Sequence, residues 1–166
     1  KITLYDLIFS LLRIRNIVKR INRQSTKVNN RSTIMKVPNS IGIVLDGNRR
    51  FSRRLMQAPE KGHEWGYKKV KELINWCKEF KIKELTLFTF SLENFSRPKK
   101  EFNYLMKLFK KAFKELQKEK KLRNFRINFI GRIWMFPLDV QKEMYSLMEK
   151  TKNNMPFKIN FAMAYS

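Results

Sequence analysis

The sequence has one cysteine, one histidine, few acidic residues and no long hydrophobic run. Cys77 has no partner for an internal disulfide, so a reducing cytoplasm is the expected compartment. No uninterrupted apolar stretch approaches the ~20 residues that cross a bilayer, and no secretory cleavage site is present. These absences predict a cytoplasmic protein that neither spans a membrane nor is exported, so that any membrane association is peripheral.

Acidic residues are scarce beside basic ones. The chain has 37 Lys and Arg against 14 Asp and Glu, and its formal net charge of +23 predicts attraction to nucleic acid, anionic lipid or diphosphate substrates. A nucleic-acid-binding protein needs basic and aromatic residues on one exposed face, whereas the aromatic residues here fall mostly on inward helical stripes. We therefore predict no nucleic-acid partner, and a basic nucleic-acid-binding protein is the least favoured alternative.

Residues 1–23 form a basic amphipathic pattern. Apolar side chains recur at steps of three and four, which predicts a helix with one apolar face. Such a helix either lies on an anionic membrane surface or packs on protein, and the pattern leaves both open. Residues 24–39 are polar and aperiodic and are predicted to form a linker. The apolar positions are Leu4, Leu7, Leu11, Ile14, Val18 and Ile21.

Residues 40–166 alternate short apolar runs with helical patterns and form one predicted domain. This alternation predicts an α/β fold, a mostly parallel sheet with helices on both faces, whose active site lies at the carboxyl ends of the strands. The helix that follows Pro98 carries an inward apolar stripe between Phe102 and Leu116. Strands are expected at 41–45, 85–90, 125–130 and 157–163, and other helices at 62–80 and 138–150.

The segment from Asp46 to Arg50 directly follows the first predicted strand, where α/β sheets place their ligands. Gly47 lets backbone amides approach an anion, and the guanidinium groups of Arg49 and Arg50 can fork onto phosphate oxygens. Asp46 can hold a magnesium ion that the phosphates also ligate. The alternative interpretation is a tight Asp-Gly turn with solvated arginines.

Two further segments offer groups suited to a diphosphate. His63, the only histidine, follows Gly62 at the expected start of a helix, where amide dipoles favour an anion. It is alternatively a cap or a surface residue. The loop from Ser91 to Pro98 closes the second predicted strand with hydroxyl, amide, carboxylate and guanidinium groups, or is an ordinary polar loop with a helix cap.

Together these segments resemble the cis-prenyltransferases, the family of undecaprenyl and dehydrodolichyl diphosphate synthases. The resemblance extends over residues 38–165, and residues 130–137 are most similar to archaeal members. It implies the cis-prenyltransferase fold, a homodimer and a magnesium-dependent reaction. In that reaction isopentenyl diphosphate is condensed onto an allylic prenyl diphosphate with cis geometry, which makes a long-chain polyprenyl diphosphate. The matching segments are residues 46–50, 62–63, 87–98 and 105–106.

The resemblance also implies roles for individual residues. Asp46 matches a catalytic aspartate that handles magnesium and the allylic diphosphate. Asn94 matches the loop linked to proton removal from isopentenyl diphosphate, and is the second predicted catalytic residue. Ser91 and Glu93 match neighbours in that loop that position the same substrate. The residues predicted to bind the allylic diphosphate are Gly47, Asn48, Arg49, Arg50, His63 and Arg97.

Other positions complete or depart from the family pattern. Phe51 and Phe95 stand where the family often has an aromatic residue suited to an allylic chain. Pro59 replaces an arginine that many bacterial members carry. The chain begins with Lys1 and stops at Ser166, before the family's C-terminal arginine and serine cluster, so we expect a C-terminally incomplete chain, inactive alone. An accessory or split-chain subunit of a heteromeric prenyltransferase is the alternative.

Overall fold

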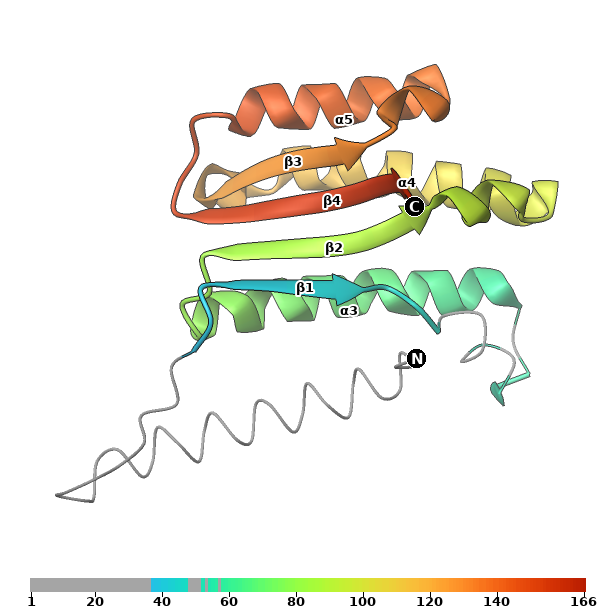
Figure 1. The fold of residues 1–166 in the computed structure, drawn as a ribbon, viewed down its shortest axis with the longest axis horizontal. Coiled ribbons are helices and arrows are strands. Elements are labelled where there is room, and N and C mark those ends of the chain that lie inside the picture. Colours follow the sequence, from blue (N-terminus) through green and yellow to red (C-terminus); the bar gives the residue numbers. More distant parts are fainter. Residues whose placement is uncertain (1–36, 48–51, 53, 57) are drawn as a thin grey trace, which may run out of the picture.

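The computed structural model describes residues 37–47, 52, 54–56 and 58–166 of the chain. Strands in these residues form one parallel sheet in the order β1-β2-β4-β3 (Figure 1). The helix predicted over residues 1–23 and most of the predicted linker lie outside the described residues. In chain order the main elements are β1 (Ser40–Val44), α3 (Pro59–Glu79), β2 (Glu84–Ser91), α4 (Lys99–Lys118), β3 (Phe125–Gly131), α5 (Leu138–Thr151) and β4 (Phe157–Tyr165).

The alternation of strand and helix confirms the predicted α/β fold with a parallel sheet. Side chains alternate between the two faces of each strand, and Leu85 and Leu87 of β2 are fully buried on the face that α3 and α4 cover (Figure 1). Helices were expected on both faces. The described helices lie over one face and along one edge, and Val44 and Ile130 on the other face are exposed to 56% and 47%.

Helix α5 lies along the outer edge of β3 (Figure 1). The backbone N–H of Ile127 donates a 3.0 Å hydrogen bond to the Thr151 hydroxyl, and the N–H of Phe129 donates to the Met148 sulfur at 3.4 Å. An edge strand otherwise presents unpaired N–H groups to other chains. Side chains of α5 therefore satisfy this edge where a further strand would otherwise pair.

The sheet face away from α3 and α4 carries a polar network. Asn160 of β4 is buried, and its amide nitrogen donates to the Glu84 carboxylate at 2.6 Å and to the Thr86 hydroxyl at 3.2 Å. Its amide oxygen accepts from Asn128 at 3.1 Å, and Lys158 pairs with Glu84 at 2.9 Å. Because the amide has all these partners, the hydrogen bonds offset the cost of burying it and help to order this face.

The covered face is packed largely by aromatic rings. Phe90 of β2 contacts the rings of Phe95, Phe102, Phe109 and Phe136 edge-on, at centroid distances of 5.0 to 6.3 Å. Edge-to-face contacts of this kind add to the gain from apolar burial. The cluster ties the end of β2 to α4 and to the segment before α5. It thereby fixes the loop between β2 and α4.

The predicted elements agree closely with the observed ones, with one informative difference. Strand boundaries fall within about two residues of those expected. Helix α3, expected from Gly62, begins at Pro59, because proline at the first helical position needs no hydrogen bond from its nitrogen. Cys77 of α3 is buried, and burial raises the pKa of its thiol to about 11.

Candidate functional site

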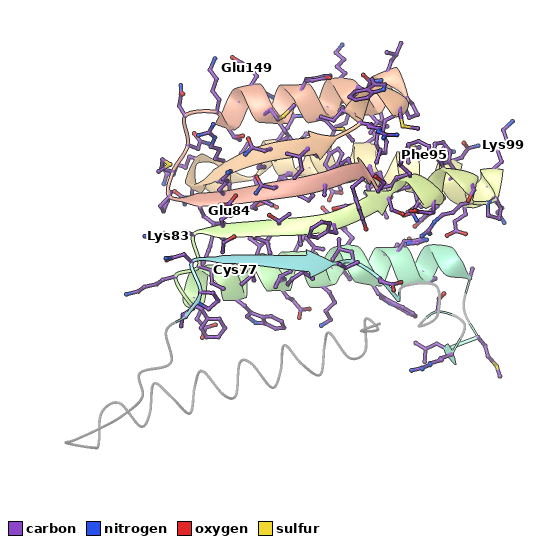
Figure 2. The ribbon with its side chains drawn as sticks, in the orientation of Figure 1. Cys77, Lys83, Glu84, Phe95, Lys99 and Glu149 are labelled. Carbon is purple, nitrogen blue, oxygen red and sulfur yellow. The ribbon has the colours of Figure 1, made fainter. Side chains whose placement is uncertain are left out.

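Polar side chains gather at the carboxyl ends of the strands. In Figure 2 Phe95 and Lys99 lie at this end of the sheet, whereas Lys83 and Glu84 lie at the other. Strands β1, β2 and β3 each lead into a loop and then a helix, so three loops meet at the carboxyl end of the parallel sheet. The candidate site therefore lies at the carboxyl ends of the strands, where the sequence predicted it.

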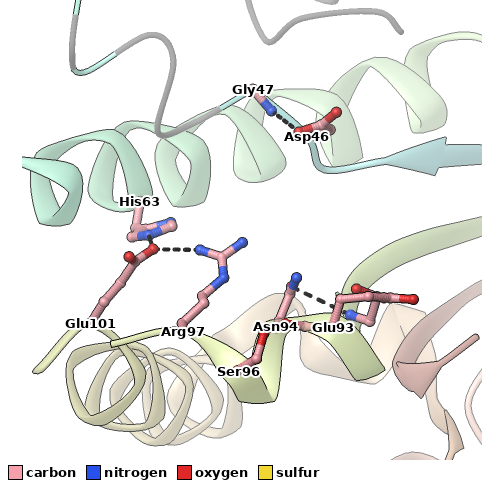
Figure 3. A network of polar contacts seen from close by, with 9 residues as sticks. Asp46, Gly47, His63, Glu93, Asn94, Ser96, Arg97 and Glu101 are labelled. Carbon is pink, nitrogen blue, oxygen red and sulfur yellow. Dashed lines mark hydrogen bonds and ion pairs between the residues drawn. The ribbon is translucent and has the colours of Figure 1, made fainter. Parts of the chain in front are cut away.

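Asp46 and Gly47 follow the end of β1 (Figure 3). Gly47 has a φ of 89°, a left-handed conformation that glycine adopts without steric cost. In this turn the N–H of Gly47 donates to Oδ1 of Asp46 at 2.5 Å. The turn thus holds the Asp46 carboxylate at the carboxyl end of the sheet.

A buried carboxylate joins two of the predicted residues (Figure 3). Oε1 of Glu101, in the first turn of α4, lies 3.1 Å from Nε2 of His63 and accepts a 2.5 Å bond from Nη1 of Arg97. Glu101 and His63 are only 6% and 7% exposed. A carboxylate that accepts hydrogen bonds from a cation is held more firmly than one in water, so Glu101 fixes both side chains.

His63 does not lie at a helix start, and that part of the prediction was wrong. Because α3 begins at Pro59, His63 is in the second turn, beyond the amide groups that have no helical acceptor. It faces α4 and contacts Glu101 instead. Sequence reasoning did not single out Glu101, although the four-residue step from Arg97 is a recognisable spacing for an ion pair.

The loop after β2 begins with a short 3-10 helix, η1 (Leu92–Ser96). Ser91 and Asn94 form a reciprocal cap, in which the Ser91 N–H donates to Oδ1 of Asn94 at 3.4 Å. The Ser96 hydroxyl donates to the carbonyl of Glu93 at 2.7 Å. A hydrogen bond from Ser91 lowers the pKa of the exposed Glu93 carboxyl. Glu93 therefore stays ionised beside the sheet edge.

Tyr165, the last residue of β4, is a neighbour of this edge that sequence reasoning missed. Burial raises the pKa of its phenol, and the charges of Glu93 and Asp46 raise it further. The charges of carboxylates from two different loops thus act on the Tyr165 phenol. No local pattern signals this position, because the proximity arises from the strand order β1-β2-β4.

A cavity of about 370 Å³ opens between α3, α4 and the sheet. Polar groups from the loops after β1 and β2 and from α3 line one end, and most of the other lining residues are apolar. The predicted stripe of α4 supplies much of the apolar wall, including Leu105, Phe109, Phe113 and Leu116. The polar lining residues at one end are Asp46, Gly47, His63, Asn94 and Arg97.

The structure thus brings together five of the predicted site residues around one cavity. Ser91 and Glu93 belong to the adjoining loop but do not line it. The Phe95 ring packs against Phe90, Phe102 and Phe136 instead of lining the cavity. Asn48, Arg49, Arg50 and Phe51 lie outside the described residues.

The side chains at the polar end of the cavity suit magnesium only when the substrate supplies further ligands. Among the described residues no three carboxylate, histidine or cysteine side chains converge on a point, so the described part of the chain offers no all-protein cage. Magnesium commonly binds through one or two carboxylates together with substrate phosphates and water. Asp46, fixed at the cavity mouth, fits that mode of binding.

Fold and site define a parallel α/β protein whose cavity has polar residues at one end and a mainly apolar wall. The family described as "Putative undecaprenyl diphosphate synthase" matches residues 44–166, and the chain belongs to this prenyltransferase family. The resemblance seen in the sequence is thereby confirmed.

Relatives with a curated function extend this result. The chain is 39% identical over 131 residues to the tritrans,polycis-undecaprenyl-diphosphate synthase (geranylgeranyl-diphosphate specific) of the archaeon Thermococcus kodakarensis. It is 37% identical over 131 residues to the isoprenyl transferase of Thermus thermophilus. Each match covers 78% of this chain and 50% of the relative. The chain therefore spans about half the length of the curated relatives it matches.

Two solved structures share the fold. The lavandulyl diphosphate synthase of Lavandula x intermedia, in complex with dimethylallyl diphosphate, gives a TM-score of 0.69 at 25% identity, covering 76% of this chain and 55% of that one. A "probable undecaprenyl diphosphate synthase" from Campylobacter jejuni gives 0.63 at 28% identity, covering 79% and 56%. The parallel arrangement of the described elements is thus that of known family members.

Proposed function

We propose that this chain carries the allylic-substrate half of a cis-prenyltransferase. The enzyme condenses isopentenyl diphosphate onto an allylic prenyl diphosphate with cis geometry and so makes a long-chain polyprenyl diphosphate. One observation carries the proposal, a single cavity with a polar mouth and an apolar interior. An allylic diphosphate has a charged head and a hydrocarbon chain, and it matches both parts.

The mouth residues suit the head group. Arg97 is a donor for diphosphate oxygens, and Glu101 orients Arg97 and His63 before a ligand arrives. Asp46 is the proposed magnesium ligand, and magnesium, when bound, supplies positive charge against the diphosphate. Negative charge grows on the diphosphate as it leaves, so donors fixed in advance accelerate that step. Asn48, Arg49 and Arg50 are proposed to add contacts.

The loop after β2 suits the second substrate. We assign Ser91, Glu93 and Asn94 to the positioning of isopentenyl diphosphate, with Asn94 next to the proton that is lost. The ionised Glu93 lies on the exposed side of the same loop. Phe51 and Phe95 remain predicted contacts to the allylic chain, and the packing of Phe95 also anchors the loop.

The proposed function is tested by elongation with radiolabelled isopentenyl diphosphate and a farnesyl or geranylgeranyl primer. We expect no elongation by the 166 residues alone, and elongation once the segment by which relatives are longer is supplied. Supplying that segment as a separate polypeptide distinguishes a split-chain enzyme from a single-chain one. Failure to elongate in every arrangement, with primer binding also absent, would contradict the proposal.

Membrane association and dimer formation are further parts of the proposal. Residues 1–36 hold nine Lys and Arg against one Asp together with an apolar stripe, a composition suited to anionic vesicles. Among the helices described, none is long and apolar enough to cross a membrane. Deleting residues 1–36 should weaken co-sedimentation with anionic vesicles, and unchanged binding would assign this segment to protein packing. Sedimentation equilibrium of the elongating protein tests the homodimer.

A further inference from the structure

One polar bridge crosses between α3 and α4 at the wall of the cavity. Tyr67 of α3 lines the cavity, and its hydroxyl donates a 2.9 Å hydrogen bond to the Glu115 carboxylate of α4. Lys71, one turn further along α3, lies 3.9 Å from the same carboxylate, and its ammonium is 4.8 Å from the Tyr67 ring centroid. Tyr67, Lys71 and Glu115 are called the latch below.

The latch joins residues of the cavity wall to side chains that are partly exposed to solvent. Tyr67 and Lys71 both line the cavity, whereas the side chains of Lys71 and Glu115 are 52% and 42% exposed. The neighbouring wall residues Val70, Ile74 and Leu116 are apolar. At the latch the two helices are therefore joined by hydrogen bonding and charge, beside apolar residues of the wall.

The hydrogen bond of the latch persists over the range of pH in which enzymes work. Burial is the largest cause that raises the pKa of Tyr67, and the bond to Glu115 and that carboxylate's charge raise it further. The phenol therefore stays protonated and continues to donate. A stable donor across the gap keeps the Tyr67 ring in one position at the cavity wall.

We propose that Tyr67 is a specificity-determining residue that limits how long a prenyl chain the cavity accepts. This inference rests on the proposed function, because it assumes that the apolar chain of an allylic diphosphate occupies the cavity. The ring takes up room at the cavity wall, and its hydrogen bond to Glu115 joins α3 to α4 there. A longer chain must either displace the ring or part the helices.

The chain offers a matched control for the latch. The Tyr104 hydroxyl of α4 donates a 3.0 Å hydrogen bond to Glu64 of α3, so it also bridges the two helices. Neither Tyr104 nor Glu64 lines the cavity. Tyr104→Phe therefore removes a comparable interhelical bond without changing the cavity wall.

Calorimetry with non-reactive allylic diphosphate analogues that differ by one isoprene unit each tests the proposal on the whole chain. For the unaltered chain, affinity should rise with length and then fall once the cavity is full. Tyr67→Ala should move that fall to longer analogues, with a gain of about tenfold for the first analogue that the unaltered chain rejects, since added buried methylene groups favour binding. Tyr67→Phe should give a smaller shift in the same direction, and Tyr104→Phe none.

The outcomes separate this inference from the proposed function. If no analogue of any length binds to the unaltered chain, the proposed function fails. If analogues bind but Tyr67→Ala and Tyr67→Phe keep the unaltered length preference, only the role of Tyr67 fails. An equal shift with Tyr104→Phe would also overturn it, because helix separation alone would then set the limit. Circular dichroism shows whether each variant is folded. If Tyr67→Ala does not fold, the length preference of Tyr67→Phe tests the role of Tyr67.

Discussion

The mouth and the interior of the cavity are built on different principles. At the mouth, each polar side chain is held by another polar group, as Glu101 holds Arg97 and His63 and Gly47 holds Asp46. In the interior, apolar side chains of α4 face the sheet and are held mainly by apolar and ring contacts. The positions of the mouth side chains depend on hydrogen bonds and ion pairs, whereas those of the interior side chains depend on how well they fill space. Changes at the mouth should therefore act mainly on chemistry, and changes in the interior mainly on stability.

The interior should show the largest effect on stability. Phe113 is 4% exposed and contacts the rings of Phe109, Phe129 and Phe161 at centroid distances of 4.8 to 6.0 Å. Phe113→Ala should lower the free energy of unfolding by about 3–5 kcal/mol, because a buried ring is lost and a void is left. Urea denaturation measures the change. Phe113→Leu, which keeps most of the apolar volume, should cost clearly less, and equal costs would show that the ring contacts do not matter.

The mouth should show the largest effect on turnover. In an elongating version of the chain, Asp46→Ala should lower turnover at least about a hundredfold, or about 2.7 kcal/mol of barrier, because it removes a charge that acts on the leaving diphosphate. The free energy of unfolding should change little, since Asp46 lies on a loop at the sheet edge. Near-normal turnover with an intact circular-dichroism spectrum would exclude the assigned role.

Glu101 sharpens the comparison because it belongs to the mouth and yet is buried. Glu101→Gln should cost about 1–2 kcal/mol of stability, since hydrogen bonds to a charged acceptor exceed those to a neutral one by about that amount. Thermal and urea unfolding of the free chain provide the measurement. A loss of turnover without any loss of stability would instead mean that the carboxylate acts on substrate and not through Arg97 and His63.

The smallest effect is expected on the polar face of the sheet, far from the cavity. The hydrogen bond from Lys158, and next that from Asn160, lower the pKa of the Glu84 carboxyl below its ordinary value of 4.5. The stabilisation is therefore present above pH 4.5 and is lost as the pH falls through the lowered value. Because the pair is partly exposed, it should contribute less than about 1 kcal/mol. Glu84→Gln should reduce the loss of unfolding free energy at acid pH by that amount, as measured by urea unfolding over a range of pH. An unchanged pH dependence would show that Glu84 does not contribute in this way.

Sequence reasoning succeeded where a signal is local. The alternation in Leu85 to Phe90 and the stripe of α4 predicted both elements and their inward faces, since side-chain period follows backbone geometry. A tight Asp46-Gly47 turn was the alternative interpretation of that segment, and the turn is present. Periodicity shows which face turns inward but not whether a partner fills the space, and part of the inward stripe of α4 lines a cavity.

The unpredicted parts of the site depend on contacts between distant residues. Glu101 meets His63 across 38 positions and Glu115 meets Tyr67 across 48, and no local pattern encodes either pair. Tyr165 approaches Asp46 and Glu93 only because β4 inserts beside β2. The start of α3 was misplaced although Pro59 gave a usable signal.

The central claim is that the cavity mouth binds an allylic diphosphate with the help of Asp46 and magnesium. Calorimetry of the 166-residue chain with a non-reactive allylic diphosphate analogue, in magnesium and in a chelator, tests it most directly. We predict affinity at least about tenfold higher with magnesium, because Asp46 would hold the ion and the ion would supply positive charge to the diphosphate. Asp46→Ala should abolish this difference while the fold is retained. Equal affinity with and without magnesium, or a magnesium effect that survives in Asp46→Ala, would contradict the account.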